Sequence, residues 1–232
     1  MSPQAAQTAT DPLNEPIQDF WQRVYDELRM RIEVPPLPNL TQLQSSRLHQ
    51  YGLTPIYIPA IGDRFPTSFV RPDWHSHLHP DVPAPRIPLT GVWVAAETIQ
   101  KPDWDNGKKY PNDLLMKTLG YETRFKTTHD DLTVSILGRI ADVLQFPADN
   151  VRLPSVEEWN FLGNVFKWLR GRRQLLAFPD LGASRSWEWC RNAVDEYRLT
   201  VGYFGRGGLT NVEAEWRGDL STSCGFRVLV AL

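Results

Sequence analysis

Apolar side chains that recur every three or four residues predict the helices of this chain. In the first such stretch, seven residues share one face: Ile17, Phe20, Trp21, Val24, Tyr25, Leu28 and Ile32. A stripe of this kind predicts an amphipathic helix that needs a surface to pack on. We expect that surface to be the main domain or, as the alternative, another copy of the chain in an oligomer.

Four later segments also carry helical signals. Short helices are expected over residues 40–51 and 112–119, and longer ones over 130–144 and from Ser155 onward. The last helix is the best specified, because Ser155 and Glu158 have the spacing of a capping box. In that motif the two side chains bond free amides at the helix start.

Two apolar runs predict strands. Residues 91–99 form the first run, and a brief extended segment is expected before it at 55–59. The second run, 226–232, is apolar on both alternating faces apart from Arg227, as expected of a strand in the middle of a sheet. We therefore expect the C-terminal strand to pair with the first run inside the core of an α+β domain.

The pattern divides the chain into three parts. Residues 1–13 are polar and predict a disordered lead. Residues 14–88 predict an N-terminal helix followed by a proline-rich ordered extension. Residues 89–232 hold the other periodic segments and, after Arg173, many glycines, which favour loops. They are expected to form the main domain.

Composition narrows the class of protein. Nine tryptophans and 19 prolines in 232 residues indicate a loop-rich fold held by aromatic anchors. The formal net charge of -2 gives no general attraction to nucleic acid or anionic membranes, so neither is expected as a partner. Neither a signal-peptide pattern nor a membrane-spanning run is evident. A cytoplasmic location is expected, with a phage particle or non-classical export as alternatives.

Four phrases in the last third of the chain belong together. They are Arg152-Leu-Pro-Ser-Val-Glu-Glu-Trp159, Asp180-Leu-Gly-Ala-Ser-Arg-Ser-Trp-Glu-Trp189, Arg206-Gly-Gly208 and Gly225-Phe-Arg-Val228. In order and spacing they resemble the RLPTEAEWE, DMxGNVWEW, RGG and GFRV phrases of the formylglycine-generating-enzyme branch of the C-type-lectin fold. That branch includes the variable proteins of diversity-generating retroelements. The first half of the chain matches no part of that family.

The resemblance implies a C-type-lectin-like domain of the formylglycine-generating-enzyme type, here with an N-terminal helical extension. In retroelement-diversified relatives the interval before the closing GFRV varies while the frame stays fixed, so a loop surface near 203–223 is expected to bind a ligand. Nine candidate contact residues lie on it: Tyr203, Phe204, Arg206, Thr210, Asn211, Glu213, Glu215, Asp219 and Ser221. Aromatic anchors mixed with short polar groups are typical of binding surfaces for a protein or glycan. A plain solvated loop is the alternative, and Trp216 is expected in or near the core.

Enzymatic activity is not expected. The oxidases of the family act on a peptide cysteine through a cysteine pair between RGG and GFR, with copper or calcium, but here that interval holds only Cys224 and the other cysteine, Cys190, lies upstream. Two cysteines are too few for a disulfide framework and are expected to be buried small hydrophobes. The calcium-supporting GNVWEW phrase is also altered.

A metal site is the remaining alternative. His75, His77 and His79 share one face of an extended chain, which is a geometry that suits zinc, copper or iron. A proline-bounded loop with solvated histidines is favoured over it, because metal sites usually draw a ligand from elsewhere too. No cofactor is therefore expected, and calcium or a transition metal stays an alternative.

Overall fold

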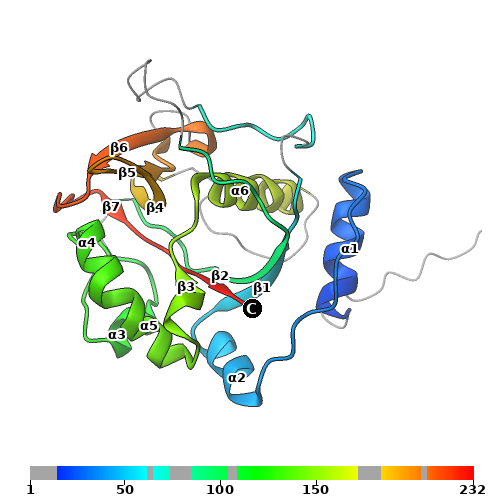
Figure 1. The fold of residues 1–232 in the computed structure, drawn as a ribbon, viewed down its shortest axis with the longest axis horizontal. Helices are drawn as coiled ribbons and strands as arrows, with labels where there is room; N and C mark the ends of the chain where they lie inside the picture. Colours follow the sequence, from blue (N-terminus) through cyan, green and yellow to red (C-terminus); the bar gives the residue numbers. More distant parts are fainter. Residues whose placement is uncertain (1–14, 62–64, 74–84, 104–108, 172–183, 205–207) are drawn as a thin grey trace, which may run out of the picture.

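Two four-stranded sheets carry the fold, and the C-terminal strand lies inside the first of them. The computed structural model describes residues 15–61, 65–73, 85–103, 109–171, 184–204 and 208–232, so the predicted disordered lead lies outside the described residues. The first sheet has the order β1 (Leu53–Ile58), β2 (Val92–Glu97), β8 (Leu229–Ala231) and β3 (Val151–Arg152) (Figure 1). β8 pairs antiparallel with β2 and with β3, which confirms the predicted central position of the C-terminal strand.

The second sheet also has four strands, and β6 (Val212–Trp216) is one of its two edge strands. The order of the strands is β6, β5 (Tyr197–Val201), β4 (Trp187–Val194) and β7 (Cys224–Gly225). β4, β5 and β6 are antiparallel, whereas β7 runs parallel to β4. The register of β4 against β5 shifts between Trp189 and Ala193, and an irregularity of this kind increases the local twist of a strand pair.

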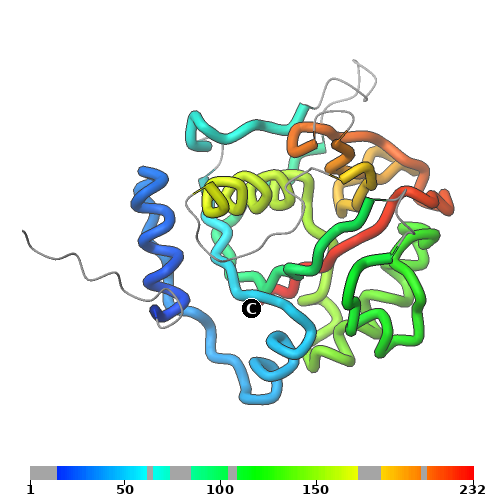
Figure 2. Tube along the Cα trace, turned by 180° about the vertical axis from the view of Figure 1, so that it is seen from behind, coloured from blue at the N-terminus to red at the C-terminus, as the bar shows by residue number. Residues whose placement is uncertain are grey.

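Helix α6 (Val156–Gly171) connects the two sheets. One part of it packs with β1 in one large apolar cluster, and Val156 and Trp159 pack with β5 in another. The expected capping box is present, because the Ser155 amide donates to Glu158 Oε2 at 2.8 Å and the Glu158 amide to Ser155 Oγ at 3.1 Å. Helix α6 therefore begins where the sequence predicts. It packs against β1 on one side and β5 on the other, and is the yellow-green helix in Figure 2.

The remaining helices gather at one side of the molecule, except for the first. They are α2 (Gln42–Gln50), α3 (Leu114–Thr118), α4 (His129–Asp131) and α5 (Leu137–Leu144). The predicted helix over 130–144 is present but is not one α-helix, since residues Leu132–Ile136 between α4 and α5 are π-helical. Short 3-10 turns follow at Ala148–Asn150 and Gly208–Thr210. The mixture of helices and two sheets confirms the α+β class.

Helix α1 (Ile17–Glu27) packs on the main domain. Trp21 and Tyr25 are fully buried. Trp21 Nε1 donates to the Pro55 carbonyl at 3.0 Å, and the Tyr25 hydroxyl donates to the Tyr57 carbonyl. The apolar stripe predicted from the sequence thus covers β1 and α6, on the side of the fold opposite α3, α4 and α5 (Figure 1).

The expected division at residue 88 does not follow a structural boundary. β1 comes from the predicted extension, yet it pairs along its whole length with β2 of the predicted main domain. The reason is that the apolar residues of 53–58 need the same core as those of 92–97. In the part of the chain that the structure describes, no helix is long and apolar enough to cross a membrane.

We predict that Trp21→Ala lowers the free energy of unfolding by about 3–5 kcal/mol, because it leaves a cavity between α1 and α6 and a carbonyl without its donor. Chemical denaturation of the purified chain measures this. Leu43→Ala on α2 is the matched control, since Leu43 is 51% exposed. A loss below about 1 kcal/mol for Trp21→Ala, the range of a surface change, would show that α1 is only loosely attached.

Candidate functional site

A buried carboxylate on β4 joins three of the four sequence phrases. Glu188, 1% exposed, accepts hydrogen bonds at 2.7 Å from both Nε and Nη2 of Arg227. Trp159 Nε1 donates to the same carboxylate at 2.6 Å, and the Tyr110 hydroxyl donates at 3.2 Å. We call Glu188, Arg227, Trp159 and Tyr110 the Glu188 cluster. Both oxygens of the carboxylate have partners, as a buried charge requires.

A second ion pair fixes the start of α6. Arg152 donates from Nη1 and Nη2 to the two oxygens of Glu158, each at 2.7 Å. Burial by itself would raise the pKa of Glu158, but the hydrogen bonds and charge of Arg152 and the Ser155 amide lower it overall. Glu158 therefore stays ionised and holds the helix start to β3.

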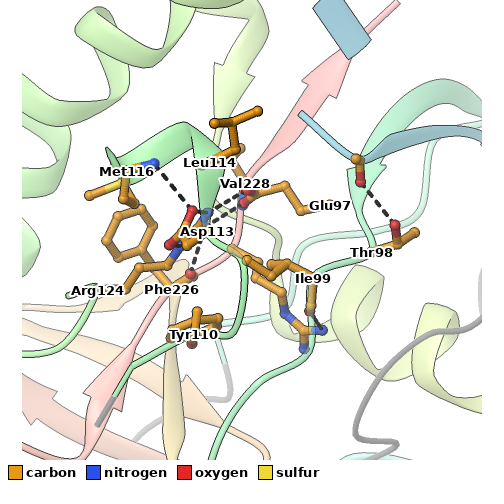
Figure 3. A network of polar contacts seen from close by, with 12 residues as sticks. Glu97, Thr98, Ile99, Tyr110, Asp113, Leu114, Met116, Arg124, Phe226 and Val228 are labelled. Carbon is orange, nitrogen blue, oxygen red and sulfur yellow. Dashed lines mark hydrogen bonds and ion pairs between the residues drawn. The ribbon is translucent and has the colours of Figure 1, made fainter. Parts of the chain in front are cut away.

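A third ion network surrounds Arg124, which is fully buried (Figure 3). Its guanidinium donates to both oxygens of Glu97 at 2.7 Å and to Asp113 at 2.5 and 2.7 Å. A further bond reaches the Phe226 carbonyl at 3.2 Å. Glu97 also accepts from the Val228 amide at 2.6 Å. The network ties the chain before the C-terminal strand to β2 and to the start of α3.

Lys101 links the segment after β2 to the second sheet. Its ammonium donates to the carbonyls of Ser186 at 2.8 Å and Gly202 at 3.1 Å, and lies 5.5 Å from the centre of the Trp159 ring. A side chain at residue 202 would meet Lys101 Nζ and the Trp159 ring at 2.7 Å, and the backbone there has a φ of +95°. Both facts require glycine at this position.

Sequence reasoning missed most of these partners. Glu97, Tyr110, Asp113 and Arg124 lie outside the motif phrases, and their contacts join positions far apart in the chain. No periodicity marks them, because each is a single charged or polar residue among ordinary neighbours. Chemically, the three networks hold carboxylates in bonds to arginine, so they stabilise the frame and leave no free acid or base.

The expected ligand surface is only partly a loop. Its middle is the edge strand β6, and Gly208–Thr210 before it form a 3-10 turn. Phe204 and Asp219 are exposed, and five more candidates are half-buried: Tyr203, Thr210, Glu213, Glu215 and Ser221. Arg206 lies outside the described residues. Tyr203 stacks on Trp187, with ring centres 5.3 Å apart, and so has a supporting role as well.

The prediction that Asn211 contacts the ligand is wrong. Asn211 is 1% exposed, because its backbone bridges to Asp73 and accepts a hydrogen bond from the Gly202 amide. A ligand on the surface does not reach it. In the described part of the chain, neither atom of its side-chain amide has a hydrogen-bond partner.

The expected burial of Trp216 is also wrong. Alternation along β6 places Trp216 on the same side as Val212 and Ala214, which pack into an apolar cluster. Trp216 comes at the end of the strand, past that cluster, and is 55% exposed. Its ring instead lies over Gly218, where an added Cβ would be 2.6 Å away. Opposite it on β5 is Tyr197, 49% exposed.

Both cysteines are buried, as predicted. Cys224 lies beside Trp187 on the neighbouring strand, but Cys190 is three residues further along β4. Burial, followed by nearby carboxylates, raises the pKa of both thiols well above the ordinary value. Neither is therefore a thiolate nucleophile near neutral pH.

The proposed histidine site stays a prediction, because His75, His77 and His79 lie outside the described residues. Within the described ranges, no group of three or more His, Cys, Asp or Glu side chains is arranged to hold a metal. His129 packs edge-on against Trp189, with ring centres 5.8 Å apart. Burial lowers its pKa to about 4, with a further contribution from Arg198, so the imidazole is neutral at pH 7.

No protein-family model matches the chain, and no curated protein matches it. One solved structure, titled "Crystal Structure of CarF", is similar with a TM-score of 0.45 and 11% sequence identity. The similarity covers 78% of this chain and 98% of that chain.

We predict that Arg227→Met destabilises the protein by about 3–5 kcal/mol, because it leaves the Glu188 carboxylate buried without its cation. Adding Glu188→Gln is expected to restore part of that loss, since the uncompensated charge is then removed. Chemical denaturation measures both. Arg23→Met is the control: it removes ion pairs to Glu15 and Glu27 that are partly exposed to solvent, worth at most about 1 kcal/mol. Equal losses for Arg227→Met and Arg23→Met would contradict the role of the Glu188 cluster.

Proposed function

We propose that this chain is a non-catalytic ligand-binding protein of the retroelement-diversified type. A C-type-lectin-like frame of the formylglycine-generating-enzyme type would display a changeable surface built on β6 and the segments flanking it. The observation that carries the proposal is the Glu188 cluster. It joins residues of three of the phrases on which the resemblance rests: Trp159 and Arg227 are buried, and each donates to the buried carboxylate of Glu188.

Burial distinguishes frame residues from surface residues within the last third of the chain. Trp159, Glu188 and Arg227, which come from three of the phrases, are at most 4% exposed. Between the phrases, Phe204 is 59% and Leu220 56% exposed. Side chains that make few core contacts can change with little loss of stability. A surface of this kind tolerates variation while the frame does not.

The chemistry of the surface favours binding to a macromolecule. Phe204, Tyr197 and Trp216 offer large rings with few rotatable bonds, and rings of this kind supply much of the energy in protein interfaces. Glu213, Glu215 and Asp219 add charge to the same segment of the chain. A protein or glycan surface is the expected ligand class.

The oxidoreductase alternative has no supporting observation. It needs an accessible thiol that ionises near neutral pH. Burial raises the pKa of both Cys190 and Cys224 instead.

We predict that the surface accepts substitution with little loss of stability. Phe204→Ser, Asp219→Ser and Leu220→Ser together are expected to lower the free energy of unfolding by less than about 1.5 kcal/mol, since each acts at an exposed position. Val212→Ser, at the buried start of β6, is expected to lower the free energy of unfolding by more than about 2 kcal/mol. Denaturation curves compare the two variants. A triple variant as destabilised as Val212→Ser would overturn the division between frame and surface.

The retroelement part of the proposal has its own test. Sequencing the DNA around the gene is expected to reveal a reverse transcriptase gene and a near-copy of the 3′ end of the coding region. The two copies should differ mainly at adenines, within the interval that encodes residues near 203–223. Absence of both elements would remove diversification from the proposal and leave a lectin-like binding protein with a fixed surface.

A further inference from the structure

A buried histidine lies where α4 meets the second sheet. His129 is 6% exposed, and its ring packs edge-on against Trp189 of β4. Within the described ranges, neither of its ring nitrogens has a hydrogen-bond partner. Thr200, directly opposite Trp189 on β5, is also fully buried, and no described residue bonds its hydroxyl. These surroundings suit the neutral form of the imidazole, because a charged ring needs water or an acceptor.

Residues 126–131, which we call the α4 segment, are attached to the second sheet and to the chain that follows β6. The His129 amide donates to the Arg217 carbonyl at 3.0 Å, and the Lys126 amide donates to the Ser221 carbonyl at 3.2 Å. Trp189 Nε1 donates to the Thr127 carbonyl at 3.1 Å. The α4 segment therefore holds one flank of the proposed ligand surface in place.

The charged groups around the ring give a positive imidazole little support. Arg198 on β5 and Arg217 after β6 carry like charge, and Asp130 beside His129 carries the opposite charge. Asp130 is already shared, because Arg217 Nε lies 3.5 Å from it and 2.8 Å from Glu196. A proton on His129 would therefore add a third cation to a place that holds two.

Burial is the largest cause that lowers the pKa of His129, from an ordinary value of 6.5 to about 4. The two other titratable groups nearby do not oppose it: the Cys190 thiol is neutral, because burial raises its pKa, and Asp131 is exposed. A histidine with a lowered pKa binds fewer protons in the folded than in the unfolded state. The stability that it contributes is therefore complete above about pH 6.5 and is lost as the pH falls toward 4.

The chain on either side of the α4 segment departs from regular geometry. Lys126 has a φ of +59°, which is unfavourable for a residue with a side chain. Residues Leu132–Ile136 are π-helical, a rare geometry that is frequent at functional sites. The segment is thus bounded by two places of less favourable backbone structure, so it can move apart from α5.

We propose that protonation of His129 releases the α4 segment from the second sheet, so that mild acid opens one flank of the ligand surface. The charged ring then reaches water, which supplies the acceptors that the buried place lacks. The opening itself depends only on these contacts, whereas its effect on a ligand rests on the binding function proposed above.

Hydrogen exchange on the full chain, measured by NMR at pH 7 and pH 5, tests the proposal. Ordinary carboxylates are still ionised at pH 5. Protection factors, which correct for the effect of pH on intrinsic exchange, are expected to fall about tenfold or more at the Lys126 and His129 amides, as the two pKa values of His129 require. The Trp159 amide, bonded to the Ser155 carbonyl in α6, is the internal reference and is expected to keep its protection.

Matched variants assign the effect to one histidine. His129→Phe keeps a ring against Trp189 but cannot titrate, so its protection factors are expected to be equal at pH 5 and pH 7. Asp130 and the carboxylates of β6 are unchanged in this variant. His49→Phe is the control, since His49 is exposed on α2, and it is expected to behave as the parent chain does. A parent-like fall in His129→Phe, or an equal fall at Trp159, would overturn the proposal.

A direct titration keeps the proposal testable if His129→Phe does not fold. The NMR signal of the His129 ring in the parent chain is expected to report a neutral imidazole above about pH 5 and to titrate together with the loss of protection. A ring that titrates near its ordinary value of 6.5 while the amides stay protected would contradict the release. These measurements use no ligand, so their failure leaves the proposed binding function intact.

Discussion

The frame of this protein depends on the burial of one ion pair, Glu188 with Arg227. Two charges withdrawn from water are unfavourable unless their bonding capacity is filled, and here Trp159 and Tyr110 complete it. These four residues come from α6, β4, the segment after β7 and the chain before α3. A single carboxylate therefore fixes the helix between the sheets, the second sheet and the approach to the C-terminal strand.

The other two networks extend the same constraint to the rest of the frame. Arg124 holds the chain before β8 to β2 and α3, and Arg152 holds the start of α6 to β3. Arg227 and Arg124 each join elements that are distant in sequence, whereas Arg152 joins β3 to the helix that follows it. Buried arginine suits this use, because its planar group bonds two carboxylate oxygens at once and stays charged.

The bonds within this frame can offset the loss of stability caused by unpartnered polar groups elsewhere in the fold. Strands β5 and β6 carry two exposed rings on one face and, on the other, the half-buried carboxylate of Glu215 and the buried Thr200 hydroxyl, which has no hydrogen-bond partner among the described residues. A half-buried charge and a buried hydroxyl without partners each lower the stability of the protein. Binding sites commonly show this exchange of stability for function.

The sequence by itself determined the elements whose signals are local. The capping box at Ser155, the stripe of α1 and the apolar C-terminal run each act over a few residues, so periodicity and spacing predicted the helix start, the packed helix and the central strand. It did not determine the π-helical interruption before α5, the burial of Asn211 or the exposure of Trp216, which depend on neighbours from other strands. Only the tertiary structure decided which charges pair. Glu97 meets Arg124, Glu188 meets Arg227 and Glu215 is left without a partner because burial and direction in space, rather than distance along the chain, select the partners of a charged group.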